Sequence, residues 1–243
     1  NKWHLDGFNP GATPLNRGFD EFYGWLISTA HSNDPYYYPY YRFHGKELVN
    51  IVENAGGAHA IHNTDLSTDD AIQFIRRNQD NPFFLYLSYL APHDPRTMPE
   101  KYRTMYKAEN ITLPKNFMEM PAFSFGWADR GRDEAVASFP RDPNEIKQHI
   151  ADYYAMISHI DDNVGKIIDA LESKNILEDT IIVFCGDNGL AIGQHGLMGK
   201  QNVYEHSVHI PLLISGPGIP AGVKIDKYVY LLDVYPTLCD ICG

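Results

Sequence analysis

The sequence has little cysteine, which excludes a disulfide framework as the basis of the fold. It contains three cysteines in 243 residues. Cys239 and Cys242 form a C-x-x-C within "LLDVYPTLCDICG", but this stretch indicates the start of a helix near the end of the chain. A redox motif would need a thioredoxin-like context, which the sequence does not show. We therefore interpret the cysteines as ordinary packing residues.

Positive charge and long apolar runs are also scarce. The chain has 20 Lys and Arg against 31 Asp and Glu, a formal net charge of −11, so we expect no nucleic-acid partner. It has no run of about 18 uncharged apolar residues, so we expect no membrane span. No signal peptide is visible. Because the chain begins at Asn1 rather than Met, we expect a fragment, and the sequence assigns neither its compartment nor its oligomeric state.

The apolar residues that are present predict an α/β protein. Continuous apolar runs at 82–90, 180–186 and 210–216 predict strands covered on both faces. The stretch 67–78 predicts a helix that starts at a Ser/Thr–acid cap. From about 143 to 173, apolar residues recur every three or four positions, which predicts a long amphipathic helix. Helices alternating with strands are typical of the α/β class.

A long irregular segment separates the first strand from the long helix. Residues 91–145 are rich in proline, methionine and aromatic residues and show weak periodicity. We expect this segment to run over the edge of the sheet, where long ordered excursions often shape binding sites.

Polar residues follow two of the predicted strands where each strand ends. The 82–90 run leads into "APHDP", which places His93 between two prolines that restrict the backbone. The 180–186 run leads into "CGDNG", so Asp187 and Asn188 directly follow the strand. Ligands of open α/β sheets lie beyond the carboxyl ends of strands, and Ca²⁺ or Mg²⁺ prefers side-chain oxygens. Asp-Asn-Gly is also a common turn, and a lone histidine is commonly structural, so both interpretations stay open.

Two further positions could bind an anion. Lys200 lies in "GKQNVYEHS", at the start of a predicted helix whose N-terminus would attract the same anion. The opening "KWHL" is predicted to be extended, so Lys2 and His4 would project to one side and Trp3 and Leu5 to the other. Such a pair suits binding and protonating an anionic oxygen. Each residue alone also fits a solvated surface position.

Together and in this order, these segments resemble the sulfatase family of formylglycine-dependent, arylsulfatase-like enzymes in the alkaline-phosphatase superfamily. The segment 187–211 is the most specific, and the matching pieces span nearly the whole chain: "KWHL", "NRGFDEFYG", "PFFLYLSYLAPHDP", "DYYAMISHIDDNVGKIIDALE", "IIVFCGDNGLAIGQHGLMGKQNVYEHSVHIPLLISGPGIPAG" and "LLDVYPTL". The resemblance implies a three-layer α/β/α sandwich with a mostly parallel sheet, alkaline-phosphatase-like and incomplete in this chain.

The resemblance also implies roles for individual residues. Asp187 and Asn188 match two of the four side-chain ligands of the family's single Ca²⁺ ion. Lys200 matches the lysine that contacts the sulfate and the leaving oxygen. His93 matches the histidine of "P-H-x-P", which lies at the sulfate and leaving-group side.

Lys2 and His4 match the family's K-x-H pair. In the family the lysine binds a sulfate oxygen and the histidine assists the hydroxyl of the nucleophile. The implied reaction is hydrolysis of a sulfate monoester, in which formylglycine attacks sulfur and a histidine or lysine protonates the departing alcohol. Cations favour it because they offset the charge of the sulfate oxygens.

Two elements of the family pattern are missing. No cysteine or serine has both Pro at +2 and Arg at +4, so the sequence lacks the Cys/Ser-x-Pro-x-Arg motif that becomes formylglycine. No Asp-Asp pair follows a predicted strand. The resemblance implies that the formylglycine lies upstream of residue 1 and that a C-terminal subdomain follows the chain. We therefore expect 1–243 to be a partial sulfatase catalytic domain that has no turnover alone and binds Ca²⁺ weakly.

Two other functions remain open from the sequence. One is a phosphodiesterase or phosphonate hydrolase on the same scaffold, and the other is a non-catalytic paralogue that binds sulfated glycans. The substrate expected from the resemblance is a small-molecule or carbohydrate sulfate ester, with a sulfated sugar, choline sulfate and an aryl sulfate all compatible. The resemblance alone suggests a periplasmic or secreted location.

Overall fold

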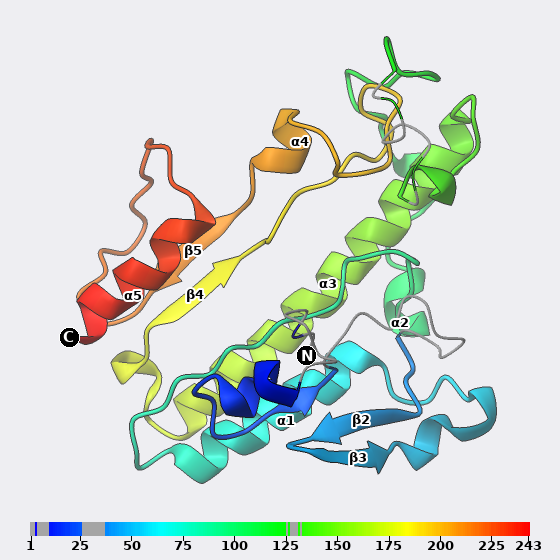
Figure 1. Cartoon of the computed structure of the whole chain (residues 1–243). Coiled ribbons are helices and arrows are strands. Elements are labelled where there is room, and N and C mark those ends of the chain that lie inside the picture. The colour runs from blue at the N-terminus through cyan, green and yellow to red at the C-terminus, as the bar shows by residue number, and fades with distance from the viewer. Residues whose placement is uncertain (1–2, 4–9, 26–36, 125, 127–130, 132) are drawn as a thin grey trace.

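Two long helices packed side by side form the centre of the molecule (Figure 1). The computed structural model describes residues 3, 10–25, 37–124, 126, 131 and 133–243. Its α-helices are α1 (Asn63–Asn78), α2 (Glu100–Arg103), α3 (Pro143–Ser173), α4 (Glu205–Val208) and α5 (Val234–Cys242). Short 3-10 turns lie at Pro10–Ala12, Pro14–Asn16, Val52–Gly57, Ala108–Asn110, Glu134–Val136, Leu177–Asp179 and Leu231–Asp233.

The strands form two small antiparallel sheets. One has the order β1-β2-β3, from Tyr23–Gly24, Tyr41–His44 and Glu47–Asn50. The other pairs β4 (Ile182–Cys185) with β5 (Leu212–Ser215), in a register that places Ile182 opposite Ser215. The β4–β5 sheet lies with α5 away from the three-stranded sheet, on the opposite side of the helix pair (Figure 1).

The long helix predicted over 143–173 is confirmed as α3. Its start follows from local chemistry: the Asp142 side chain accepts hydrogen bonds from the Asn144 and Glu145 N–H groups at 2.7 and 3.0 Å, and Pro143 occupies the first helical position. Most of the predicted apolar stripe is at least half-buried, but Ile157 is exposed.

Helix α1 begins earlier than the sequence predicts. The expected start was the Ser67-Thr68 cap, whereas the helix begins at Asn63 and Ser67 and Thr68 are buried within it. His62 takes the capping role, because its Nδ1 accepts the Thr64 N–H at 3.2 Å. Histidine is outside the usual set of N-cap residues, so pattern reading missed this start.

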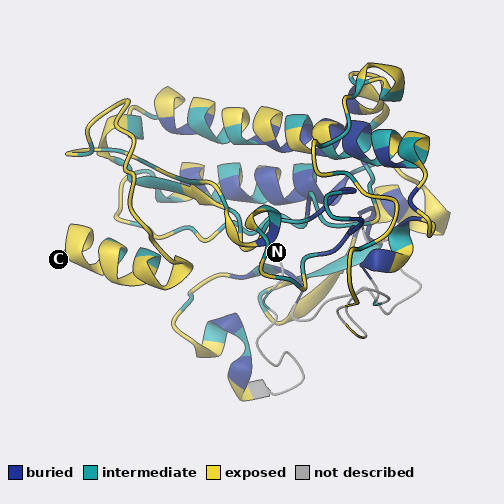
Figure 2. Ribbon diagram, turned by 90° about the horizontal axis from the view of Figure 1, so that it is seen from above, coloured by how far each residue is buried: buried dark blue, intermediate teal, exposed yellow. Residues whose placement is uncertain are grey.

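Two buried clusters connect the irregular segments to α3. The first holds Tyr37 and Tyr38 with Met98, Tyr102 and Met156, and the second holds Ala137, Ile146, Ile150, Ile192 and Met198. The second cluster therefore anchors the loop after β4 on the first turns of α3. Figure 2 shows that burial is concentrated between the two long helices and the segments over them, whereas α5 is mostly exposed and has no buried residue.

The predicted strand at 82–90 is wrong. The segment is extended, but within the described residues none of its backbone groups pairs with another strand, apart from a turn in which Leu90 accepts the His93 N–H. A strand requires a hydrogen-bonded neighbour, which a run of apolar residues cannot supply by itself. Coverage on both faces is also wrong, since Phe84 and Tyr86 are 62% and 65% exposed.

The predicted strands at 180–186 and 210–216 are confirmed as β4 and β5, but their predicted coverage on both faces is wrong, since Phe184 and Leu213 are 41% and 58% exposed. Among the described residues, however, all strand pairs are antiparallel, so the expected mostly parallel sheet is not seen there. A parallel pair needs a crossover connection, usually a helix of several turns. The connection from β4 to β5 contains only the four-residue helix α4, and the chain folds back beside β4.

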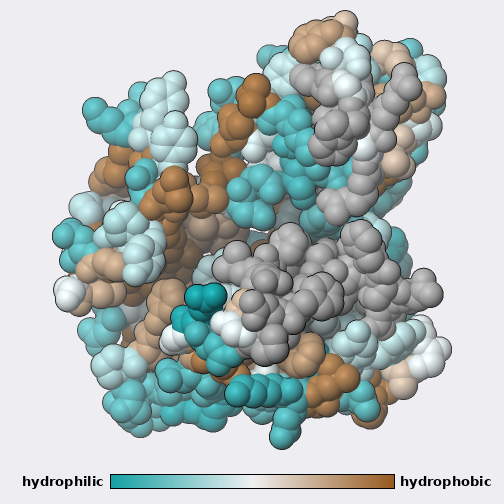
Figure 3. Space-filling model, in the orientation of Figure 1, coloured by the Kyte–Doolittle hydropathy of each residue, from teal (hydrophilic) through white to brown (hydrophobic). Residues whose placement is uncertain are grey.

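The exposed apolar surface is concentrated in the C-terminal part. Figure 3 shows hydrophobic side chains gathered near β5 and α4, and Phe184, Leu213 and Val208 are exposed there.

The interpretation of the cysteines as packing residues is wrong, because all three are free and exposed. Cys239 and Cys242 lie on α5, which has no buried residue. None of the described helices is both long and apolar enough to cross a bilayer.

Candidate active site

The connection from β4 to β5 carries three of the predicted site residues. Its two ends are fastened together, because the Gly186 N–H donates to Pro211 O at 3.3 Å and the Gly189 N–H donates to Ser207 O at 2.9 Å. At Gly189 a side chain has no space: a Cβ there would lie 2.1 Å from the His206 carbonyl oxygen. The sequence therefore uses glycine where two backbone segments of this connection touch.

Asp187 and Asn188 lie at the carboxyl end of β4 and are exposed. The Asn188 N–H donates to Asp187 Oδ1 at 2.9 Å, and the Asn188 Nδ2 donates to the Gly189 carbonyl at 2.8 Å. Asp187 Oδ2 and Asn188 Oδ1 have no hydrogen-bond partner within the described residues. Two unpartnered side-chain oxygens on adjacent residues fit a hard cation such as Ca²⁺, which takes six to eight oxygen ligands, so this pair supplies part of a shell.

Lys200 was predicted to lie at the start of a helix, and this prediction is wrong. It lies at the end of a compact loop. The loop is closed by hydrogen bonds from the Ala191 N–H to Gly199 O (3.0 Å) and from the Gly193 N–H to Leu197 O (2.8 Å). Helix α4 begins only at Glu205, and at four residues it is too short to add an anion site for Lys200. Lys200 is half-buried, and its ammonium makes no hydrogen bond or ion pair with any described residue.

His93 is held from both sides in the turn after the extended segment 82–90. Its Nδ1 donates to the Asp94 carbonyl at 2.7 Å and lies 3.2 Å from Asp94 Oδ1. The Tyr37 hydroxyl donates to the His93 carbonyl. These contacts add to the restriction from the flanking prolines and fix the imidazole with only 18% of its side chain exposed.

Among the predicted site residues that the structure describes, only the sequence neighbours Asp187 and Asn188 are hydrogen-bonded to each other. Asp187, Asn188 and Lys200 share one connection, and the segment before His93 runs near the end of β4. Partial burial raises the pKa of the Tyr86 phenol, and the neighbouring Cys185 and Asp187 raise it further. No hydrogen bond or ion pair links His93 to Lys200 within the described residues. Lys2 and His4 lie outside the described residues, so their placement stays a prediction.

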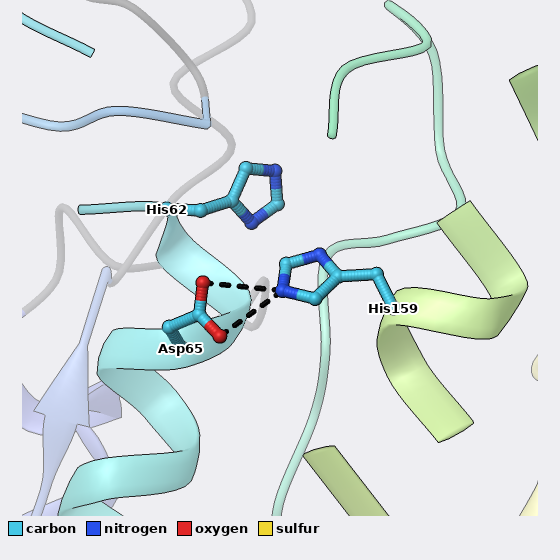
Figure 4. A group of neighbouring side chains, drawn as sticks. All are labelled: His62, Asp65 and His159. Carbon is cyan, nitrogen blue, oxygen red and sulfur yellow. Dashed lines mark hydrogen bonds and ion pairs between the residues drawn. The ribbon is translucent and has the colours of Figure 1, made fainter. Parts of the chain in front are cut away.

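A second group of polar side chains, missed by sequence reasoning, lies between α1 and α3. His62, Asp65 and His159 place a ligand atom each within 4.8 Å of one another (Figure 4). The His159 Nε2 donates to the two Asp65 oxygens at 3.0 and 3.1 Å, and the Asn163 Nδ2 donates to Asp65 Oδ1 at 3.2 Å. The spacing of His62 and Asp65 on one helix turn was visible in the sequence, but the contact with His159 was not.

The chemistry of this group differs from that of a calcium site. Two imidazoles and one carboxylate suit a metal such as Zn²⁺, whereas Ca²⁺ prefers oxygen alone. Both His62 nitrogens are already used, since Nδ1 accepts the Thr64 N–H and Nε2 donates to the Thr97 carbonyl at 3.2 Å. The group is therefore a hydrogen-bonded contact between the two helices, and the calcium prediction stays with Asp187 and Asn188.

Burial and pairing set the protonation of this group. Burial, and to a smaller extent the nearby His159, lower the pKa of His62 to about 4. Burial raises the pKa of Asp65, but the hydrogen bond and charge of His159 outweigh that effect, with help from Asn163, and the pKa falls to about 2. His62 is therefore neutral and Asp65 ionised at neutral pH.

Among the described residues, the oxygens at the end of β4 suit a hard cation, and the ammonium of Lys200, which pairs with none of those residues, suits an anionic ligand. The chain belongs to the sulfatase family, since the family model described as Sulfatase matches residues 1–243. The chain is 31% identical over 217 residues to arylsulfatase K of Mus musculus, a match that covers 83% of this chain and 39% of that protein. It therefore spans well under half the length of this curated relative.

Solved structures confirm the α/β fold class. The crystal structure of Ps i-CgsB in complex with k-i-k-neocarrahexaose is similar over 100% of this chain and 49% of that chain, with a TM-score of 0.70 and 26% identity. The phosphonate monoester hydrolase of Agrobacterium radiobacter is similar over 73% of this chain and 38% of that chain, with a TM-score of 0.60 and 28% identity.

Proposed function

We propose that the protein containing this chain is a sulfuric ester hydrolase and that residues 1–243 form the sulfate-binding part of its catalytic domain. The observation that carries this proposal is the ammonium of Lys200, which pairs with no described residue and is held on a fixed loop in a chain that belongs to the sulfatase family throughout its length. A sulfate monoester is a poor electrophile because its oxygens are negatively charged. A fixed cation offsets this charge most strongly as it grows on the leaving oxygen.

The described side chains take complementary roles in this proposal. Lys200 binds a sulfate oxygen and stabilises the leaving oxygen. Asp187 and Asn188 contribute oxygens to a bound Ca²⁺, which supplies charge stabilisation to the sulfate when present. His93 lies on the leaving-group side, where its fixed ring orients and protonates the departing alcohol.

The remaining roles fall on residues that the structure does not describe or that the chain does not contain. We propose that Lys2 binds a sulfate oxygen and that His4 assists the nucleophile. The sequence contains no Cys/Ser-x-Pro-x-Arg motif. We therefore propose that the formylglycine nucleophile and the other calcium ligands come from residues outside this chain.

The substrate class is a sulfate ester, and a sulfated sugar is our first candidate. A sugar is favoured because a structure similar over the whole chain, Ps i-CgsB, contains k-i-k-neocarrahexaose. Hydrolysis of a phosphonate monoester is the second candidate function, because the phosphonate monoester hydrolase of Agrobacterium radiobacter shares the fold over 73% of this chain.

The direct test is substitution of the lysine in the protein that contains this chain. Lys200→Met keeps the length of the side chain and removes the charge, and we expect sulfate release to fall about a hundredfold to a thousandfold. Lys224→Met, at an exposed position, is the matched control and should leave the rate unchanged. Equal rates for the two variants would contradict the role of Lys200.

A further inference from the structure

Two buried side chains of opposite charge fasten the 133–141 segment to the loop that carries Lys200. Glu134 is only 2% exposed, and its carboxylate faces the loop backbone. Its Oε2 accepts the Met198 N–H at 2.8 Å and its Oε1 accepts the Gly199 N–H at 2.7 Å. One carboxylate thus accepts the N–H groups of the two residues that directly precede Lys200.

Arg141 completes this contact from the other side. Its Nη2 forms an ion pair with Glu134 Oε2, and its Nε donates to the Gly196 carbonyl at 3.0 Å. Its Nη1 donates to the Glu134 and Ala137 carbonyls at 3.0 and 2.7 Å. The guanidinium therefore fixes the carboxylate, its own segment and the far side of the loop at once.

The neighbouring residues leave the loop little freedom to move. A Cβ at Gly199 would lie 2.6 Å from Glu134 Oε1, and one at Gly196, where φ is +76°, would lie 2.5 Å from the Met120 carbonyl carbon. On the other side of Lys200, the Gln201 Nε2 donates to Asp133 Oδ2 at 2.8 Å. The consecutive acids 133 and 134 thus hold both sequence neighbours of Lys200.

We propose that Glu134 and Arg141 are positioning residues that aim Lys200 at the sulfate group. This inference rests on the function proposed above. A lysine side chain has four rotatable bonds, so its ammonium can be placed no more accurately than the backbone that carries it, and a displacement of about 1 Å can cost a hundredfold in rate.

The pairing of Glu134 with Arg141 also prevents Glu134 from forming an ion pair with Lys200. A lone buried carboxylate beside the loop would attract the lysine ammonium. Arg141 neutralises Glu134, and within the described residues Lys200 forms no ion pair. A buried ion pair of this kind contributes little net stability compared with apolar packing, so its value lies in the geometry that it fixes.

The test compares Glu134→Gln with Glu145→Gln in the protein that contains this chain. The side chain of Glu145 lies nearby but hydrogen-bonds only to Ser138 in the described structure, so Glu145→Gln is a matched control. We expect Glu134→Gln to lower kcat/KM for sulfate release about tenfold to a hundredfold, and Glu145→Gln to leave it unchanged. In a Lys200→Met background, Glu134→Gln should lower the residual rate less than about threefold, because its effect acts through the lysine.

Amide hydrogen exchange tests the contact without any need for turnover. We expect Glu134→Gln to speed exchange in residues 196–201 about tenfold or more, with no change along α3. If Glu134→Gln does not fold, Arg141→Lys replaces it, since it keeps the charge and loses the donor to Gly196. Unchanged exchange in the variant that folds would overturn the inference.

The activity measurements separate this inference from the proposed function. An equal loss of rate from Glu134→Gln with and without Lys200 would show a merely structural role and overturn the positioning role. Absence of sulfate release from the unsubstituted protein would instead overturn the proposed function, while the exchange measurement would still decide whether Glu134 and Arg141 hold the loop.

Discussion

At the scale of single residues, three members of the candidate site, Asp187, Asn188 and Lys200, have polar side-chain atoms that pair with no described residue. One carboxylate oxygen of Asp187 accepts the Asn188 N–H, and the other pairs with no described residue. Lys200 has no partner within the described structure, although both of its sequence neighbours are hydrogen-bonded. Fixed but unpaired charged groups are poised to bind ligands, because no internal contact has to be broken first.

Removal of the charge at the strand end should weaken calcium binding. We expect Asp187→Asn to lower the Ca²⁺ affinity of the protein on the order of tenfold or more, because the charge of the ligand oxygens sets the affinity of such sites. Titration calorimetry with Ca²⁺ measures the change. Asp161→Asn, an exposed acid on α3, is the control. An unchanged affinity for Asp187→Asn would exclude this residue as a ligand.

The neutral state of His62 predicts a dependence of stability on pH. Its pKa is lowered from 6.5 to about 4 in the folded protein. Between these pH values the unfolded chain binds a proton that the folded protein does not, so stability falls as the pH falls. The slope is at most about 1.4 kcal/mol per pH unit. Asp65, with a pKa of about 2, adds a loss only below about pH 4.

A variant isolates the contribution of His62. His62→Asn keeps a side chain that can cap α1 but does not titrate. We expect a smaller decrease in the free energy of unfolding between pH 6.5 and pH 4 than in the unsubstituted protein, measured by urea denaturation. His44→Asn, at an exposed position, should leave the decrease unchanged. If His62→Asn shows the same decrease as the unsubstituted protein, His62 is not the group that causes the loss of stability.

At the scale of elements, α3 supports both the helix pair and the loop that carries Lys200. Its middle contacts α1 through the His159–Asp65 pair, and its first turns hold the loop through Ile146 and Ile150. The loop fits closely there, because a Cβ at Gly193 would lie 2.7 Å from Ile146 Cγ2.

Two glycine substitutions should have opposite effects on stability. Gly165 lies on the exposed side of α3, and an added Cβ there would have no other atom within 4 Å, so Gly165→Ala should raise stability by about 0.5 to 1 kcal/mol. Gly189→Ala would collide with the His206 carbonyl and should lower stability by about 1 to 3 kcal/mol. Thermal denaturation measures both changes. A neutral Gly189→Ala would contradict the close approach of the two backbone segments.

The elements that sequence reasoning predicted well are those set by local chemistry. The Asp142 cap, Pro143 and the three-to-four spacing define α3 without help from other parts of the chain. The strand prediction at 82–90 failed for the opposite reason, because a strand forms only where a second strand lies beside it to share hydrogen bonds. The contact of Asp65 with His159 joins residues 94 positions apart, and no local pattern predicts it.

At the scale of the whole molecule, family membership and the described site support one another. The family model covers residues 1–243, yet the chain spans only 39% of arylsulfatase K of Mus musculus. Sequence reasoning singled out Asp187, Asn188, Lys200 and His93 from the order of the motifs, and their roles stay a prediction. It did not find Glu134 and Arg141, because their role depends on a loop more than 50 residues further along the chain.

The most direct test of a sulfatase function is the ester preference of the protein that contains this chain. Initial rates are measured with an aryl sulfate and with a phosphonate monoester carrying the same leaving group, each with Ca²⁺ and after chelation. We predict faster release of sulfate than of phosphonate, and loss of the sulfate reaction on chelation with recovery when Ca²⁺ is restored. Phosphonate hydrolysis with no release of sulfate would contradict the account.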